Sequence, residues 1–258
     1  MKRPNPVRTA FNRAREYELQ ARIQAHVAKK LAQSLPSIDS HTPIFGLELG
    51  CGTGFLSRLI LQQLPESQWL LTDIAPAMIH RTRENLLSAP GAKRNFLVMD
   101  AECPCLRTSF DMITASLVFQ WFRQPSISMP SIFRLLTPKG RLLFATLGPD
   151  TFREWRTLCE QNQVPCGLHH YPDKNFWHDL AVQHGMDLTF SEEYLREVYP
   201  SPMAFLKQLK AIGAKTPAPN HKPVAPGVLR HLLVTTSTAN QSFTVTHHVY
   251  FGTFSHRP

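Results

Sequence analysis

Hydrophobic positions along the chain alternate between short continuous runs and stretches with helical spacing. Apolar runs that predict strands occupy residues 44–49, 69–72, 95–99, 110–118 and 141–146. Apolar side chains recur every three or four positions between them, which predicts helices over 55–64, 77–87 and 126–136. A further helix is predicted over 9–35, ended by Pro36. This alternation predicts right-handed crossovers and a doubly wound, Rossmann-like α/β fold with a mostly parallel sheet.

The pattern changes at Gly148-Pro149. The following residues are richer in polar side chains, proline and histidine, and they are predicted to be mostly helical, with an exposed loop over 216–226. Ser242 to Phe254 alternates like strands. We therefore predict one domain with four parts: an N-terminal helical segment (1–40), a ligand-binding core (41–148), a helical insertion that covers the sheet's edge as a lid (149–240) and closing strands (241–258).

Composition narrows the class of protein. The 258 residues carry 28 Lys and Arg against 19 Asp and Glu, a net charge of +9, which favours an acidic partner. No apolar run approaches a membrane span, and no secretory signal is evident, so a cytoplasmic location is expected. The five cysteines are too few for a disulfide framework, and Cys103-Pro104-Cys105 has no second pair at ligand spacing. No metal site is predicted.

A glycine-rich loop follows the first predicted strand and reads Glu48-Leu49-Gly50-Cys51-Gly52-Thr53-Gly54. Glycines at alternate positions allow a sharp turn and close approach of a ligand to the backbone. The next helix points its N-terminus at the same place. Asp73 follows the second strand, where a carboxylate can accept both hydroxyls of a ribose. Loop and acid together predict a nucleoside-containing cofactor.

The charges near the loop discriminate between cofactors. A dinucleotide loop usually reads G-x-G-x-x-G and holds a pyrophosphate, which Glu48 would repel. S-adenosylmethionine carries a sulfonium and an ammonium group, so an acid at this position suits it. Asp100-Ala101-Glu102 supplies another carboxylate in reach of an adenine amino group, although Asp100 is also a plausible helix cap.

These residues resemble the class I S-adenosylmethionine-dependent methyltransferases. The segments Ser109 to Ile113 and Leu135 to Arg141 are similar to that superfamily's fourth strand and to the turn before its fifth. The cofactor-binding residues predicted on this basis are Glu48, Gly50, Gly52, Gly54, Asp73, Ile74, Met78, Asp100, Ala101, Glu102 and Ser116.

Further stretches resemble the malonyl-[acyl-carrier protein] O-methyltransferases of biotin synthesis. They are Phe11-Asn12-Arg13-Ala14 with Tyr17 and Gln24, Leu117 to Trp121, Leu206 to Ala214 and Thr246 to Gly252. The resemblance spans nearly the whole chain. It implies methylation of the free carboxylate of a malonyl thioester, carried by acyl-carrier protein or by coenzyme A. An acidic carrier protein would also explain the basic surplus, because residues 1–30 hold eight Lys and Arg against two acids.

A malonyl carboxylate is ionised at pH 7, so the implied reaction needs no general base. A buried Arg or a Tyr hydroxyl is the natural group to hold it. Candidates for substrate positioning are Tyr17, Gln120 and Trp121, and candidates for substrate or partner binding are Lys207 and Lys210. The aromatic residues are equally typical of a core, and the lysines of a solvated surface.

Other functions stay open at this point. A methyltransferase of another small carboxylate or of a quinone precursor is compatible with the same motifs, and so is a non-methylating assembly factor of this fold. An NAD-dependent oxidoreductase is disfavoured by Glu48 and the glycine spacing. A nucleic-acid methyltransferase is disfavoured because Leu117-Val118-Phe119-Gln120-Trp121 stands where an Asn-Pro-Pro-Tyr-like motif would be.

Overall fold

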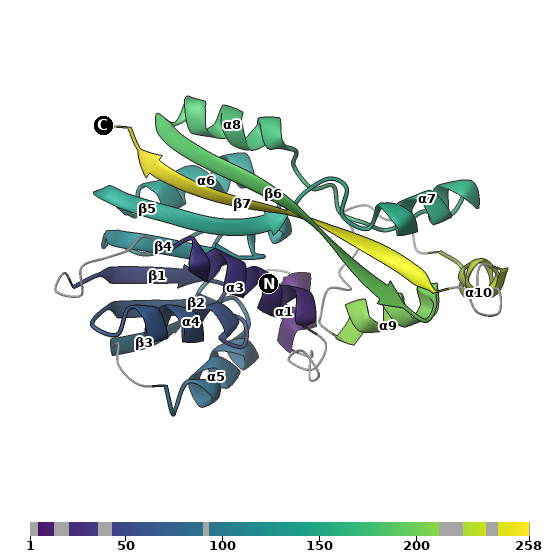
Figure 1. Cartoon of the computed structure of the whole chain (residues 1–258), viewed down its shortest axis with the longest axis horizontal. Coiled ribbons are helices and arrows are strands. Elements are labelled where there is room, and N and C mark those ends of the chain that lie inside the picture. The colour runs from purple at the N-terminus through teal and green to yellow at the C-terminus, as the bar shows by residue number, and fades with distance from the viewer. Residues whose placement is uncertain are drawn as a thin grey trace.

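The computed structural model of the chain describes residues 5–12, 21–35, 43–89, 93–211, 224–235 and 242–257. Within these residues a seven-stranded sheet has the order β3-β2-β1-β4-β5-β7-β6 (Figure 1). The strands are β1 (Phe45–Leu49), β2 (Gln68–Asp73), β3 (Lys93–Val98), β4 (Phe110–Ser116), β5 (Leu136–Leu147), β6 (Met186–Tyr199) and β7 (Phe243–His256). The doubly wound, mostly parallel sheet predicted from the sequence is confirmed.

Strands β1 to β5 are parallel, so their carboxyl ends meet at one edge of the sheet. β1 lies in the middle between β2 and β4, and four of its five residues are buried. Helices on both faces account for this continuous burial. The turn predicted within Leu135 to Arg141, at Pro138-Lys139-Gly140, lies inside β5, where the pairing with β4 shifts register between Phe110 and Met112. The turn is therefore a bulge at the strand's beginning.

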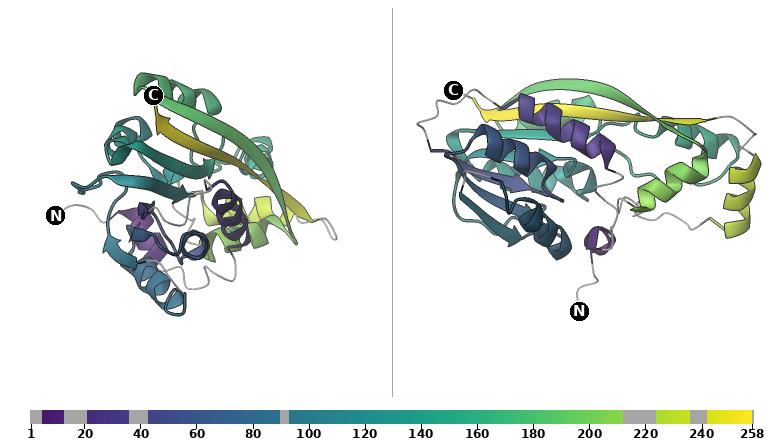
Figure 2. Two further views of the ribbon diagram at one scale, coloured as in Figure 1. Left: turned by 60° about the vertical axis from the view of Figure 1, so that its left-hand side comes forward. Right: turned by 60° about the horizontal axis from the view of Figure 1, so that its bottom comes forward.

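Helices cover the two faces of this sheet in separate layers (Figure 2). α3 (Arg22–Gln33), α4 (Phe55–Gln63) and α5 (Pro76–Asn85) pack on one face. α6 (Pro125–Phe133) and α8 (Lys174–Gln183) pack on the other. The two cores have different side chains at their centres. Trp69 and Leu31 are buried in the first, and Phe144 and Trp177 in the second.

The region predicted as a helical insertion contains a long strand instead of helices alone. β6 pairs antiparallel with β7 along all fourteen of its residues, and β7 pairs antiparallel with β5. β6 is the edge strand, and its positions alternate between exposed and half-buried. Charged residues such as Glu192, Glu193 and Arg196 occupy the strand, so its hydrophobic pattern is too weak to predict a strand. The prediction of a mostly helical segment over 149–240 missed this strand, while the other four described elements of the segment are helices.

The outer part of the β6–β7 ribbon extends past the parallel sheet (Figure 1). Three helices pack on it: α7 (Arg153–Gln161), α9 (Pro202–Ala211) and α10 (Pro226–Thr235). Phe205, Trp155 and Val245 are buried between them and the ribbon. This region thus has a small hydrophobic core of its own, and we call it the ribbon extension.

The predicted N-terminal helix over 9–35 is not continuous. α1 (Pro6–Asn12) and α3 are separate helices, and Ala21 before α3 has non-helical backbone angles. Tyr17 lies outside the described residues, as does most of the predicted loop over 216–226. None of the described helices has the length and apolar character needed to cross a membrane.

Candidate active site

The glycine-rich loop leaves the end of β1 with a backbone that ordinary residues adopt rarely. Gly50 and Gly52 have φ angles of 67° and 56°. A Cβ on Gly50 would lie 2.5 Å from Cγ2 of Val118, so a side chain has no room there. The loop is joined to β2 because Cys51 N donates to the Thr72 carbonyl at 2.8 Å. These contacts explain the glycines at alternate positions.

Two side chains of α5 donate hydrogen bonds to backbone carbonyls of the loop. Thr82 Oγ1 donates to the Gly52 carbonyl at 2.6 Å, and Asn85 Nδ2 donates to the Thr53 carbonyl at 2.9 Å. The carbonyls of Gly52 and Thr53 are thus bound by α5, which restricts the conformation of the loop. It therefore forms a preorganised floor at the carboxyl ends of the parallel strands, where open α/β sheets bind ligands.

Asp73 ends β2 beside this floor. Its Oδ2 accepts from Gly52 N at 3.0 Å, and its Oδ1 accepts from Ala75 N at 2.8 Å. Burial raises the pKa of this carboxyl to about 6, although the two backbone hydrogen bonds act in the opposite direction. The carboxylate is thus held in a fixed orientation, with lone pairs left to accept from a ligand hydroxyl.

Glu48 is buried inside the protein, whereas the sequence analysis placed it next to the cofactor. Its side chain is buried, and Ser57 Oγ donates to Oε2 at 2.6 Å. Burial raises its pKa to about 7, and the nearby Asp73 carboxylate acts in the same direction. Glu48 is not among the described residues that line the cavity above the loop. The structure therefore gives it a contact with the first turn of α4 and no direct contact with that cavity.

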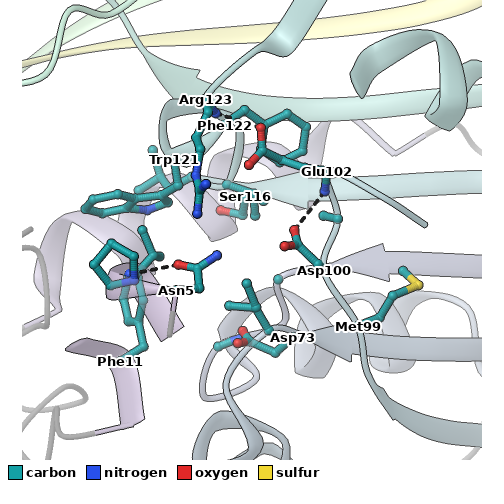
Figure 3. Close-up of a pocket in the computed structure, with 18 of the residues that line it drawn as sticks. Asn5, Phe11, Asp73, Met99, Asp100, Glu102, Ser116, Trp121, Phe122 and Arg123 are labelled. Atoms are coloured by element: carbon teal, nitrogen blue, oxygen red, sulfur yellow. Dashed lines mark hydrogen bonds between the residues drawn. The ribbon is translucent and has the colours of Figure 1, made fainter. Parts of the chain in front are cut away.

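A cavity of about 590 Å³ opens above the loop (Figure 3). Nine of the residues predicted from the sequence line it: Gly50, Gly52, Asp73, Ile74, Asp100, Ala101, Glu102, Ser116 and Trp121. They come from the ends of β1, β2, β3 and β4, which the parallel topology brings together. Asp100 is exposed here, and one of its oxygens also accepts from Glu102 N at 3.0 Å. No helix follows Asp100, so the helix-cap interpretation was wrong: the hydrogen bond from Glu102 N closes a turn before β4.

The other predicted residues lie elsewhere. Met78 is fully buried and packs with Ala75 against Phe11 of α1. Gln120 is buried, and its amide bonds internally, donating to the Leu117 carbonyl and accepting from Thr146 Oγ1. Gly54 begins α4 beneath the floor. Lys207 and Lys210 are exposed on α9 and do not line the cavity.

The opposite wall of the cavity contains residues that the sequence analysis missed. Phe11 comes from α1, and Asn5 immediately precedes that helix. α1 is held against α5 because Asn12 Oδ1 accepts from Ala77 N at 3.2 Å. The Trp121 ring contacts Phe11 edge-on at 5.5 Å and His169 at 5.7 Å between centroids. Phe122 and Arg123 complete this wall, as Figure 3 shows for both. Phe11 and Trp121 belong to stretches that carry the family resemblance, but no motif connects them with Arg123 or His169, so only the fold could bring these residues together.

Electrostatically, the floor side of the cavity is acidic. Asp73 and Asp100 lie there, while aromatic rings form the opposite wall and the Glu102 carboxylate accepts from the backbone of Arg123 in that wall. A cationic nucleoside with an amino-acid tail matches the acidic side. Among the described residues, no group of three or more His, Cys, Asp or Glu side chains has the geometry of a metal site.

Comparison with known proteins defines the family. A methyltransferase-domain profile matches residues 47–142. The malonyl-[acyl-carrier protein] O-methyltransferase of Magnetococcus marinus is 37% identical over 245 residues, which cover 95% of this chain and 90% of that protein. The crystal structure of the YcgJ protein from Bacillus subtilis has a TM-score of 0.63 at 12% identity and covers 90% of this chain and 99% of that chain.

A second solved structure was determined with a product of the methyl donor. The phosphoethanolamine N-methyltransferase 2 of Haemonchus contortus, in complex with phosphomonomethylethanolamine and S-adenosylhomocysteine, has a TM-score of 0.59 at 15% identity. The match covers 97% of this chain and 60% of that chain. The profile match and the Magnetococcus marinus relative show that the chain is an S-adenosylmethionine-dependent methyltransferase, and its fold agrees with that class. Within that class, the chain belongs to the malonyl-[acyl-carrier protein] O-methyltransferase family.

Proposed function

We propose that this protein methylates the free carboxylate of a malonyl group bound as a thioester to acyl-carrier protein, an early step of biotin synthesis. The observation that carries the proposal is the 37% identity to a malonyl-[acyl-carrier protein] O-methyltransferase over 95% of the chain. The cavity supports it, because it has room for a nucleoside and a small acyl group together.

The two sides of the cavity would bind different reactants: the acidic side would bind the cofactor, and the aromatic wall would contact the acyl group. Asp73 would accept from the ribose hydroxyls, and Asp100 from the adenine amino group. S-adenosylmethionine supplies a methyl group on a positively charged sulfur. Trp121, Phe11 and His169 form the aromatic wall against which the acyl group would lie. That wall excludes water from the reacting oxygen and keeps it close to the methyl carbon.

Transfer joins an anion and a cation and leaves two neutral products. A carboxylate oxygen forms a bond to the methyl carbon, the carbon–sulfur bond breaks, and its electron pair stays on sulfur. No proton moves, because the malonyl carboxylate is already ionised at pH 7. The protein's contribution is therefore orientation and desolvation, and no residue has to act as a base.

The carrier protein would approach from the side of the ribbon extension. Lys207 and Lys210 lie on the exposed surface of α9, which is on the same side of the molecule as α1 (Figure 1). Acyl-carrier proteins are acidic, so exposed lysines near the cavity suit a landing surface. A flexible thioester arm would then reach the cavity past α1.

The test supplies radiolabelled S-adenosylmethionine together with malonyl-carrier protein, malonyl-coenzyme A, acetyl-carrier protein or RNA in parallel reactions. We expect base-labile label on the two malonyl substrates and none on acetyl-carrier protein, which lacks the accepting carboxylate. Label on RNA, or label on acetyl-carrier protein equal to that on the malonyl form, would contradict the proposal.

A further inference from the structure

Arg123 is a cation that faces the acyl side of the cavity. It lies in the loop between the short 3-10 helix Phe119–Trp121 and α6. Figure 3 shows its side chain extending from this loop into the space between Trp121 and Ser116. Among the described residues that line the cavity, Arg123 alone carries a permanent positive charge.

The backbone under Arg123 is held in place by an acid from another strand end. Glu102 Oε1 accepts from Arg123 N at 2.6 Å and from Gln124 N at 3.3 Å. α6 then begins at Pro125, and the Gln124 carbonyl accepts from Ile127 N and Ser128 N. Glu102 therefore stabilises the loop by binding main-chain donors, and it leaves the guanidinium available.

The guanidinium itself has no anionic partner within the part of the chain that the structure describes. No carboxylate there lies within ion-pair distance of it. Asp73 and Asp100 line the floor side, where the cationic cofactor is expected, and Arg123 stands beside the aromatic wall. Arg123 is exposed, and a planar guanidinium with free donors beside an aromatic wall is suited to a carboxylate.

We propose that Arg123 binds the malonyl carboxylate and thereby selects it over neutral acyl groups; this rests on the function proposed above. Its guanidinium donates to one carboxylate oxygen while the second oxygen attacks the methyl carbon. The oxygen–carbon bond forms, the carbon–sulfur bond breaks with its electron pair going to sulfur, and no proton is transferred. The methyl ester is neutral, so it loses the ion pair with Arg123, which favours release of the product.

A carboxylate is also present in the amino-acid tail of the cofactor, so the test must separate the two sources. The variants are Arg123→Gln and Arg123→Lys, with Arg107→Gln as the matched control. Arg107 is also an exposed arginine, but it precedes Phe110 and therefore lies at the opposite end of β4 from the cavity. For each protein we would measure KM and kcat with malonyl-carrier protein and with malonyl-coenzyme A. Calorimetry would give the Kd for S-adenosylhomocysteine and, in its presence, for malonyl- and acetyl-carrier protein.

We expect Arg123→Gln to raise KM about 30-fold for both malonyl substrates, because a charge-assisted hydrogen bond is lost. The preference for malonyl- over acetyl-carrier protein should fall by a similar factor. Arg123→Lys should keep part of this preference, and Arg107→Gln should match the wild type in both KM and preference. The Kd for S-adenosylhomocysteine should stay within about twofold in all variants.

Each alternative outcome is distinct. An unchanged KM and preference in Arg123→Gln, with an active wild type, would overturn the role of Arg123 and leave the proposed function standing. A rise confined to the Kd for S-adenosylhomocysteine would assign Arg123 to the cofactor's carboxylate and also overturn the proposal. A wild type that binds S-adenosylhomocysteine but does not methylate either malonyl substrate would refute the proposed function and this inference together.

Discussion

The fold shifts the pKa values of carboxyl groups in opposite directions in the cofactor-binding core and on the antiparallel β6–β7 ribbon. In the core, burial raises the pKa of Glu48 to about 7 and that of Asp73 to about 6. On the ribbon, hydrogen bonds lower the pKa of Glu197 and Glu193 despite an opposing contribution from burial. The two sets differ in the partners that the tertiary structure provides.

The partners explain the contrast. Glu197 accepts from the Tyr199 hydroxyl and from Gln208 Nε2, and His247 Nε2 lies 3.5 Å from it. Glu193 accepts from Lys30 Nζ at 2.6 Å and thereby joins β6 to α3. Glu48 is fully buried and receives one hydroxyl, from Ser57. The ribbon acids therefore stabilise the fold in their charged form, whereas the core acids are kept at an energetic cost beside the site.

The first and largest prediction compares two glycines with similar backbones, one in the glycine-rich loop and one between α8 and β6. Gly52 and Gly185 have φ angles of 56° and 63°. Gly52→Arg should abolish binding of S-adenosylhomocysteine, with Kd raised at least about 100-fold, because its side chain would enter the cavity. Gly185 has open space around it, so Gly185→Arg should leave Kd unchanged. Calorimetry with both variants measures this. Wild-type affinity in Gly52→Arg would show that the cofactor binds elsewhere.

The second prediction concerns the buried acid of the core. The folded pKa of Glu48 is about 7 and its ordinary value is 4.5, so the folded state binds this proton more tightly than the unfolded state. Wild-type stability should fall as pH rises from 4.5 to 7. Glu48→Gln should therefore be more stable than wild type at pH 8, on the order of 2 kcal/mol, and equal to it near pH 4.5. Urea unfolding of the cofactor-free proteins measures the difference, and a variant less stable than wild type at pH 8 would refute it.

The third prediction is that replacing Glu197 lowers the stability of the protein, whereas replacing Glu48 raises it. Hydrogen bonds lower the pKa of Glu197, so its contribution to stability is present above its ordinary value of 4.5 and is lost as pH falls through the lower folded value. Glu197→Gln should be destabilised by about 1 kcal/mol at pH 7, and the difference should shrink under acid conditions. The same urea series checks it. A difference that grows as pH falls would contradict the assignment.

The fourth and smallest prediction concerns the exposed lysines of the ribbon extension. Reversing the charge of Lys207 and Lys210 should raise KM for malonyl-carrier protein a few-fold at low salt and leave KM for malonyl-coenzyme A unchanged. High salt should reduce the effect, because exposed charges are screened. Lys139→Glu is the control, since Lys139 is exposed near the beginning of β5, away from the strand ends that form the cavity. An effect on both substrates, or none on either, would argue against a landing surface on α9.

The floor of the site was predictable because its residues are local in sequence. Gly50, Gly52 and Asp73 immediately follow strands with strong apolar patterns, and parallel pairing brings such positions to one edge. The burial of Glu48 was not predictable for a related reason. An acid at a strand's end is visible in the sequence, but whether it faces the cavity or α4 depends on which side of the strand is covered.

The sequence by itself determined the parallel core, the glycine-rich loop and the family, since these depend on short-range patterns of apolar residues, glycines and acids. Only the tertiary structure decided that β6 is a strand, because its partner β7 lies some fifty residues further along the chain and supplies its hydrogen bonds. The same holds for Phe11, Arg123 and His169 in the wall of the cavity, whereas Trp121 beside them was predicted from the sequence. These residues come from segments far apart in sequence, and only the packing of the folded chain brings them to one cavity.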